Sequence, residues 1–225
     1  MDLRTFLGRL REARELIDIR EPVSMEYEAG AICRQLSDAN GPAAVLHKVG
    51  HADAPLVVNV YGTRRRVALA LDTNEADLLG HVARKLKTRV ATEPHDGSAP
   101  RCQEVVLTGK DVNILQWPFP LWNLGDGGRY ITAGQIIARH PEFGWNIAYH
   151  RAQLYNETEL GICMAPEHHL RYTADEARGR SKVEAAIVVG VRPSISIASG
   201  SDFPIGDYEL EVAGALEGRA IRTVR

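Results

Sequence analysis

Three polar side chains, Asn146, His150 and Arg151, interrupt a stretch of sequence that otherwise has the composition of a buried β-strand. The stretch reads GWNIAYHRAQ over residues 144–153. Side chains alternate between the two faces of a strand, so Asn146 and Arg151 are expected on opposite faces or on either side of a bulge. A purely structural interpretation stays open, in which Asn146 lies in a turn and Arg151 at a sheet edge.

Two further groups of residues have side chains of the kinds that bind metals in proteins. His168 and His169 are adjacent, and imidazole is a common protein ligand of transition metals. Adjacent residues rarely reach one ion, so a helix-capping and surface pair is the competing interpretation. The stretch DYELEVAGAL supplies Asp207, Glu209 and Glu211, which a solvated helix face also explains. One of these carboxylates, with an asparagine oxygen and an imidazole, would complete a ligand set suited to Mn²⁺.

The composition argues against several classes of protein. The chain has 225 residues, with 27 Lys and Arg against 29 Asp and Glu, so it lacks the positive charge typical of nucleic-acid or acidic-membrane binding. Its 3 cysteines are widely spaced, as expected of reduced thiols in a cytoplasmic protein. We expect no signal peptide and no membrane span, because no apolar run approaches the required length.

The hydrophobic pattern divides the chain into two regions that must position these side chains. Residues 1–103 mix helices with strands, and a polar stretch near residue 100 marks the predicted boundary. Residues 104–225 are mostly β, typical of a barrel or sandwich. Helices are predicted over residues 3–17, 26–39, 74–89 and 170–179. Strands are predicted over residues 43–49, 56–62, 66–71, 104–109, 130–140, 145–156, 159–165, 184–191 and 194–199.

Other motifs favour structural explanations. Asp72 and Glu75 form a predicted capping box for the helix over residues 74–89. Residues 207–218 are ambiguous, although their apolar spacing fits one face of a helix. The glycines of NLGDGGRY lack the spacing of a phosphate-binding loop and indicate a tight turn.

In their order along the chain, the motifs resemble the UbiD family of prenylated-FMN-dependent decarboxylases. The resemblance rests on PFPLWNLGDGGRYITAGQII, NIAYHRAQ, HHL, AAIVVGVRPSISIAS and YELEVAGALEG. Residues before the boundary are similar to the N-terminal α/β region of that family. The implied fold is α+β, with an N-terminal α/β domain over residues 1–103. The implied second domain, over residues 104–225, is a prenylated-FMN-binding split β-barrel that is truncated at its C-terminal end.

The resemblance also implies a role for each polar residue. The Asn-x4-Arg motif of the family corresponds to Asn146 and Arg151. Asn146, His169 and Glu209 correspond to ligands of a divalent cation, usually Mn²⁺, which anchors the flavin phosphate, and Glu211 is the alternative carboxylate. Such a cation offsets the cost of holding the phosphate charge in a partly buried site. The other implied cofactor-binding residues are Ile147, Ala148, Tyr149, Arg151, His168 and Ser199, and Ser199 is also an implied ligand of K⁺.

The implied reaction is the reversible, non-oxidative decarboxylation of an aromatic or α,β-unsaturated carboxylic acid. The cofactor acts as the electron sink, and the protein orients and protonates the substrate. Arg151 is the implied catalytic residue, because its guanidinium suits a substrate carboxylate. A separate flavin prenyltransferase would supply the cofactor.

The family's later EGPFGE-like acid segment and its flavin-contacting lysine have no counterpart in the sequence. We therefore expect a truncated product, a subunit completed by a second polypeptide, or a remnant that binds the cofactor without catalysis. The expected protein partner is a homo-oligomer or a complementary C-terminal chain. Two other functions stay open. One is a non-catalytic flavin- or metal-binding accessory subunit, and the other is an FMN-dependent oxidoreductase of the split-barrel type.

Overall fold

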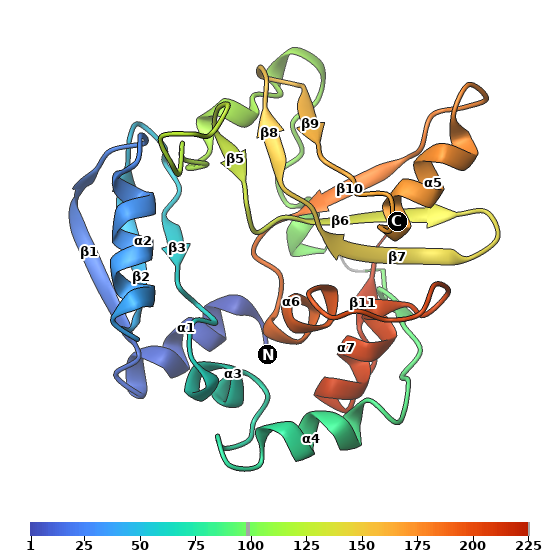
Figure 1. Cartoon of the computed structure of the whole chain (residues 1–225), viewed down its shortest axis with the longest axis horizontal. Helices are drawn as coiled ribbons and strands as arrows, with labels where there is room; N and C mark the ends of the chain where they lie inside the picture. The colour runs from blue at the N-terminus through green and yellow to red at the C-terminus, as the bar shows by residue number, and fades with distance from the viewer. Residues whose placement is uncertain (98–99, 225) are drawn as a thin grey trace.

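The computed structural model describes residues 1–97 and 100–224 and combines helices with small sheets (Figure 1). The α+β class is confirmed, but no sheet closes on itself within these residues, so the split barrel stays a prediction. The helices are α1 Leu3–Glu12, α2 Glu28–Asp38, α3 Arg64–Ala70, α4 Leu78–Lys85, α5 His169–Ala177, α6 Pro193–Ser199 and α7 Glu209–Glu217. The strands are β1 Leu16–Val23, β2 Ala43–Val49, β3 Leu56–Val58, β4 Glu93–Pro94, β5 Tyr130–Ile131, β6 Gln135–His140, β7 Gly144–Tyr149, β8 Ala152–Leu154, β9 Leu160–Ile162, β10 Ala185–Val188 and β11 Arg222–Thr223.

The first sheet has the order β1-β2-β3, with β1 parallel to β2 and β3 antiparallel to it. Helix α1 begins after Asp2, whose carboxylate accepts the Thr5 N–H at 2.8 Å. It buries Phe6 and Leu10 in a core with Leu16. The predicted helix over residues 3–17 is wrong at its end, because Leu16 begins β1 and pairs with Ala43 instead.

Two segments that were predicted as strands are helices in the structure. Residues 66–71 lie mostly in α3, which starts where the Thr63 hydroxyl accepts the Arg66 N–H. Residues 194–199 form α6, which Pro193 starts at its first position. The serine and isoleucine alternation in α6 imitates a strand, but the Ser199 hydroxyl bonds back to the Ile195 carbonyl at 2.7 Å, as in a helix.

Two more predictions fail at polar or exposed positions. The predicted strand over residues 104–109 is absent, and Val105, Val106 and Leu107 are exposed there. The Asp72 and Glu75 capping box is also wrong, because α4 starts only at Leu78 and Asp72 pairs with Arg9.

The second part of the chain is built on two antiparallel sheets of order β10-β6-β7 and β5-β8-β9. Helix α5 packs on one face of the first of these, where Leu170 joins Ile136 and Ala138 in a buried cluster. On the other side, Ile147 of β7 packs with residues of α6 and α7 (Figure 1). The same core includes Leu78 of α4, so the helices of the first region support the strand that carries Asn146.

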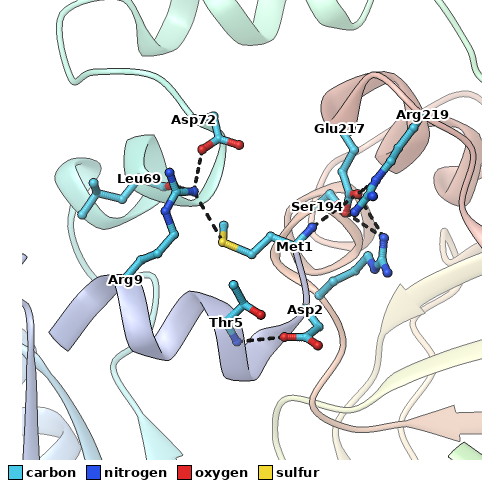
Figure 2. Close-up of polar contacts among 10 residues, drawn as sticks. Met1, Asp2, Thr5, Arg9, Leu69, Asp72, Ser194, Glu217 and Arg219 are labelled. Atoms are coloured by element: carbon cyan, nitrogen blue, oxygen red, sulfur yellow. Dashed lines mark hydrogen bonds and ion pairs between the residues drawn. The ribbon is translucent and has the colours of Figure 1, made fainter. Parts of the chain in front are cut away.

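A polar cluster ties this helical layer together around Glu217 (Figure 2). Its carboxylate accepts hydrogen bonds from Ser194 at 2.7 Å, Arg219 at 2.9 Å and Arg192 at 3.0 Å. The amino group of Met1 lies 3.5 Å away. Burial raises the pKa of Glu217, but the hydrogen bonds from Ser194 and Arg219 and the charge of Arg192 outweigh it and bring the pKa below its usual value. In the described part of the chain, no helix is long and apolar enough to cross a membrane.

Candidate cofactor and metal site

The strand β7 carries the first of the predicted site residues. Asn146 lies within it, opposite Ala138 of β6, and is therefore not a turn residue. Because β7 ends at Tyr149 and β8 begins at Ala152, His150 and Arg151 occupy the break between the strands. The polar residues of this stretch thus lie within a strand and in the break that follows it.

The three predicted metal ligands converge from three separate elements. Asn146 comes from β7, His169 is the first residue of α5, and Glu209 is the first residue of α7. The Asn146 Nδ2 is 2.7 Å from Glu209 Oε1 and 3.4 Å from His169 Nδ1. The packing of Ile147 against α7 holds the strand and the helix at this distance.

Glu209 is a buried carboxylate without a full counter-charge. Its residue is 4% exposed, and burial raises its pKa, although the Ile147 N–H, which donates to Oε2 at 2.9 Å, opposes the shift. No lysine or arginine makes an ion pair with it in the described part of the chain. A bound cation would compensate for the cost of this burial.

The donor chemistry of the three side chains fits a divalent cation. A half-turn of the Asn146 amide would bring its Oδ1 to the position between the imidazole and the carboxylate. One amide oxygen, one imidazole and one carboxylate suit Mn²⁺ or a similar ion. The described residues contain no group of three His, Cys, Asp or Glu side chains that could hold a metal, so this set depends on the amide.

The three side chains open onto a hollow of about 290 Å³, which we call the triad hollow. Of the other predicted cofactor-binding residues, Ala148, Tyr149, His168 and Ser199 line it. Ile147 lies beneath it, 2% exposed, and contributes its backbone N–H. Glu211 is not among the lining residues, so the structure selects Glu209 as the carboxylate facing Asn146 and His169.

Arg151 is not brought to the triad hollow. It is exposed and lines a second hollow of about 380 Å³ together with Tyr130, Thr132, Gln153 and Cys163. Its guanidinium makes no hydrogen bond or ion pair with another described residue. The expected separation of Asn146 and Arg151 onto different sides is therefore observed.

The sequence reasoning did not assign a role to His150. This residue lines the triad hollow, is 5% exposed, and has no hydrogen-bond partner for either ring nitrogen among the described residues. Burial first, and then the charge of His168, lower its pKa. The nearby Cys163 backbone partly opposes this shift, although it does not form a hydrogen bond with either ring nitrogen. The alternation of Asn146, Ala148 and His150 along one face was the signal that could have identified it.

His168 stands beside it at the start of α5. The two rings meet edge to face, with centroids 5.1 Å apart. The Nδ1 of His168 accepts the Ala165 N–H at 3.2 Å, so its proton lies on Nε2 when the ring is neutral. His168 thus precedes the first residue of α5, as in the capping interpretation, although its side chain makes no capping hydrogen bond, whereas His169 turns toward Asn146.

Comparison with known proteins gives consistent matches over the whole chain. Pyrrole-2-carboxylic acid decarboxylase from Pseudomonas aeruginosa is 28% identical over 243 residues, covering 100% of this chain and 48% of that protein. Anhydromevalonate phosphate decarboxylase from Methanothermobacter thermautotrophicus is 25% identical over 224 residues, covering 99% of this chain and 50% of that protein. The chain thus spans about half the length of the curated relatives that it matches.

The fold is similar to that of solved decarboxylases. The UbiD-class enzyme HmfF from Pelotomaculum thermopropionicum, in complex with FMN, superposes with a TM-score of 0.91 at 28% identity, covering 100% of this chain and 50% of that one. Vanillic acid decarboxylase from Sedimentibacter hydroxybenzoicus, in its closed form, gives a TM-score of 0.94 at 25% identity with the same coverage.

The family patterns agree with these matches. The N-terminal domain of 3-octaprenyl-4-hydroxybenzoate carboxy-lyase (UbiD) matches residues 7–86, and the Rift-related domain of the same carboxy-lyase matches residues 94–225. The chain therefore belongs to the UbiD family.

Proposed function

We propose that this chain is the cofactor- and metal-binding half of a UbiD-type decarboxylase. The proposed reaction removes CO₂, reversibly and without oxidation, from an aromatic or α,β-unsaturated carboxylic acid. The convergence of Asn146, His169 and Glu209 beside a hollow carries the proposal. The FMN bound by the related HmfF enzyme, and the acids named in the relatives pyrrole-2-carboxylic and vanillic acid decarboxylase, support it.

In this proposal, Asn146, His169 and Glu209 hold Mn²⁺, which would neutralise the phosphate of prenylated FMN. Ser199, which is 5% exposed and lines the hollow, would contribute a lone pair of its hydroxyl oxygen to a neighbouring K⁺. Ala148, Tyr149 and His168 would lie along the flavin. The bound flavin would supply the electron sink for the loss of CO₂.

Arg151 would bind the substrate carboxylate from the second hollow. Its exposed guanidinium has no partner of its own in the described part of the chain, so its donors are available. We further propose the division into an α/β domain over residues 1–103 and part of a flavin-binding split barrel over residues 104–225. A cytoplasmic location, a homo-oligomer or complementary chain, and a flavin prenyltransferase as cofactor supplier complete the proposal.

Co-expression with a flavin prenyltransferase tests this function. The purified protein is expected to show the absorbance of prenylated FMN and to contain Mn²⁺ in a one-to-one ratio. His169→Ala should lose both, whereas His51→Ala should keep both, because His51 is exposed and lies outside the triad hollow. Ordinary FMN that is reduced by NADH would instead support an oxidoreductase. Metal without flavin would support an accessory subunit and contradict the proposal.

A further inference from the structure

A further hollow, of about 660 Å³, lies between the first region and the sheets of the second part of the chain. The first region contributes Leu3 of α1 and Leu56 of β3, and the second part contributes Ile131 of β5 and Ile187 of β10. We call it the aromatic hollow, because its wall includes Tyr61, Trp117, Phe119, Trp122 and Tyr130. Its volume is that of a site for a small organic molecule, and the proposed function does not use it.

The aromatic wall indicates the shape of the molecule that would fit. Two of the 3 tryptophans of the chain line this one hollow. Aromatic side chains contribute a large contact area and pack well, by stacking or edge to face, on another flat ring. The composition of the wall therefore favours a planar aromatic ligand.

Part of this wall is held in place without a ligand. The guanidinium of Arg129 donates to the carbonyl oxygens of Phe119 at 2.7 Å, Trp117 at 2.8 Å and Leu115 at 3.2 Å. Pro118, between the two aromatic residues, restricts the backbone further. Because the segment is already ordered, a ligand does not have to order it on binding.

Arg4 supplies the charge of the aromatic hollow. In the described part of the chain, it is the only Lys, Arg, His, Asp or Glu residue that lines this hollow. Arg4 is exposed, and its guanidinium makes no hydrogen bond or ion pair with any described residue. Since Ile131 is only 5% exposed, the charge lies toward the mouth of the hollow and the apolar surface lies deeper. This arrangement suits an anion with an apolar body, and the forked donors of arginine match a carboxylate.

We propose that the aromatic hollow binds an aromatic carboxylate, with the ring against the aromatic wall and the carboxylate on Arg4. The inference does not rest on the proposed function, because Arg4 and not Arg151 binds the acid and the metal ligands lie elsewhere. The aromatic hollow and the second hollow are neighbours that share Trp122, Tyr130 and Thr132. Trp117 lines the aromatic hollow but not the second hollow, so it reports on the aromatic hollow separately.

Titration of the full chain with naphthalene-2-carboxylate tests this inference. In protein labelled with ¹⁵N in its tryptophan rings, the 3 indole N–H signals are assigned by single Trp→Phe substitutions. The acid should shift the signal of Trp117 and leave that of Trp145, which lies on β7 outside both hollows. Isothermal titration calorimetry measures the affinity.

Substitution of Arg4 separates the charge from the ring. Arg4→Gln should weaken naphthalene-2-carboxylate about tenfold, because the acid loses a charge-assisted hydrogen bond. The uncharged analogue naphthalene-2-methanol should bind this variant within about twofold of the wild type. Ala54→Trp adds a large side chain to the lining of the hollow and should weaken both compounds.

Arg20→Gln is the matched control, because Arg20 is also exposed but lies outside the aromatic hollow. This variant should bind both compounds as the wild type does. Circular dichroism and thermal melting verify that each variant is folded.

Three results would overturn the inference. They are an unmoved Trp117 signal, an equal loss of acid binding in Arg4→Gln and Arg20→Gln, and a loss of acid binding in Arg151→Ala, which would place the acid in the second hollow. Each would leave the proposed function intact. The proposed function is tested instead by retention of Mn²⁺ and prenylated FMN, to which the aromatic hollow contributes none of the proposed metal ligands.

Discussion

Asn146 and Glu209 are 63 residues apart in the sequence, yet the Asn146 Nδ2 lies 2.7 Å from Glu209 Oε1. The pair joins the strand β7 to the first residue of α7. A buried carboxylate next to an amide and an imidazole is costly without a cation and favourable with one. This relationship is the basis of the first prediction.

Glu209→Gln should reduce Mn²⁺ affinity by at least tenfold without lowering the melting temperature of the metal-free protein. The reason is that glutamine keeps the shape of the side chain and removes a charge whose burial is unfavourable. Isothermal titration with Mn²⁺ and thermal melting measure the two effects. Glu211→Gln is the control, because Glu211 lies outside the triad hollow. Equal loss of metal in both variants would contradict the assignment of Glu209.

Arg151→Ala should leave Mn²⁺ and FMN binding within about twofold of the wild type. Arg151 lines the second hollow, and its guanidinium has no partner to lose in the described part of the chain. Decarboxylation by the complete enzyme should fall by orders of magnitude, because the substrate carboxylate loses its partner. A large loss of flavin in this variant would place Arg151 in cofactor retention instead.

Gly30→Ala should destabilise the protein by about 2 kcal/mol. A Cβ at Gly30 in α2 would clash with the backbone oxygen of Trp122, so the contact between the first region and the segment before β5 must open. Gly8→Ala is the matched control, because a Cβ at Gly8 in α1 meets nothing within 4 Å. This change should stabilise the protein by about 1 kcal/mol, since alanine is the better helix former. Urea unfolding measures both, and equal effects would refute the contact.

The Glu217 cluster should make stability sensitive to acid. The pKa of Glu217 is lower in the folded chain, so the unfolded chain takes up a proton first as the pH falls. The stabilisation is complete above the ordinary glutamate pKa of about 4.5 and is lost as the pH falls through the depressed folded value. Glu217→Gln should therefore flatten the fall of the melting temperature below about pH 4.5. An unchanged acid profile would show that the cluster adds nothing to stability.

The convergence of Asn146, His169 and Glu209 could be predicted because each of these residues matches a motif of the family. Asn146 lies in a strand, and His169 and Glu209 each start a helix, which limits where their side chains can reach. The motif register favoured Glu209 over Glu211, but which of the two carboxylates faces Asn146 depends on how α7 is rotated against Ile147. That rotation follows from tertiary packing and not from local pattern.

The errors in secondary structure also have physical causes. In α6, serine and isoleucine alternate as in a strand, and only Pro193 and the serine back-bonding favour a helix. In α3, short apolar residues fit either structure, and the capping hydroxyl of Thr63 decides the outcome. His150 was missed because no motif marks a residue by the hydrogen bonds that it lacks.

The positions of His169 and Glu209 at the start of α5 and α7 also affect how the chain folds during its synthesis. A ribosome synthesises Asn146 first and Glu209 last of the three, and at 5–20 residues per second several seconds separate them. During that interval the nascent chain has an amide and then an imidazole but no acidic ligand, and Ile147 still awaits α7 as its cover. The proposed metal site and the cover of Ile147 by α7 therefore depend on the same segment of the nascent chain, and neither can form before Glu209 has been synthesised.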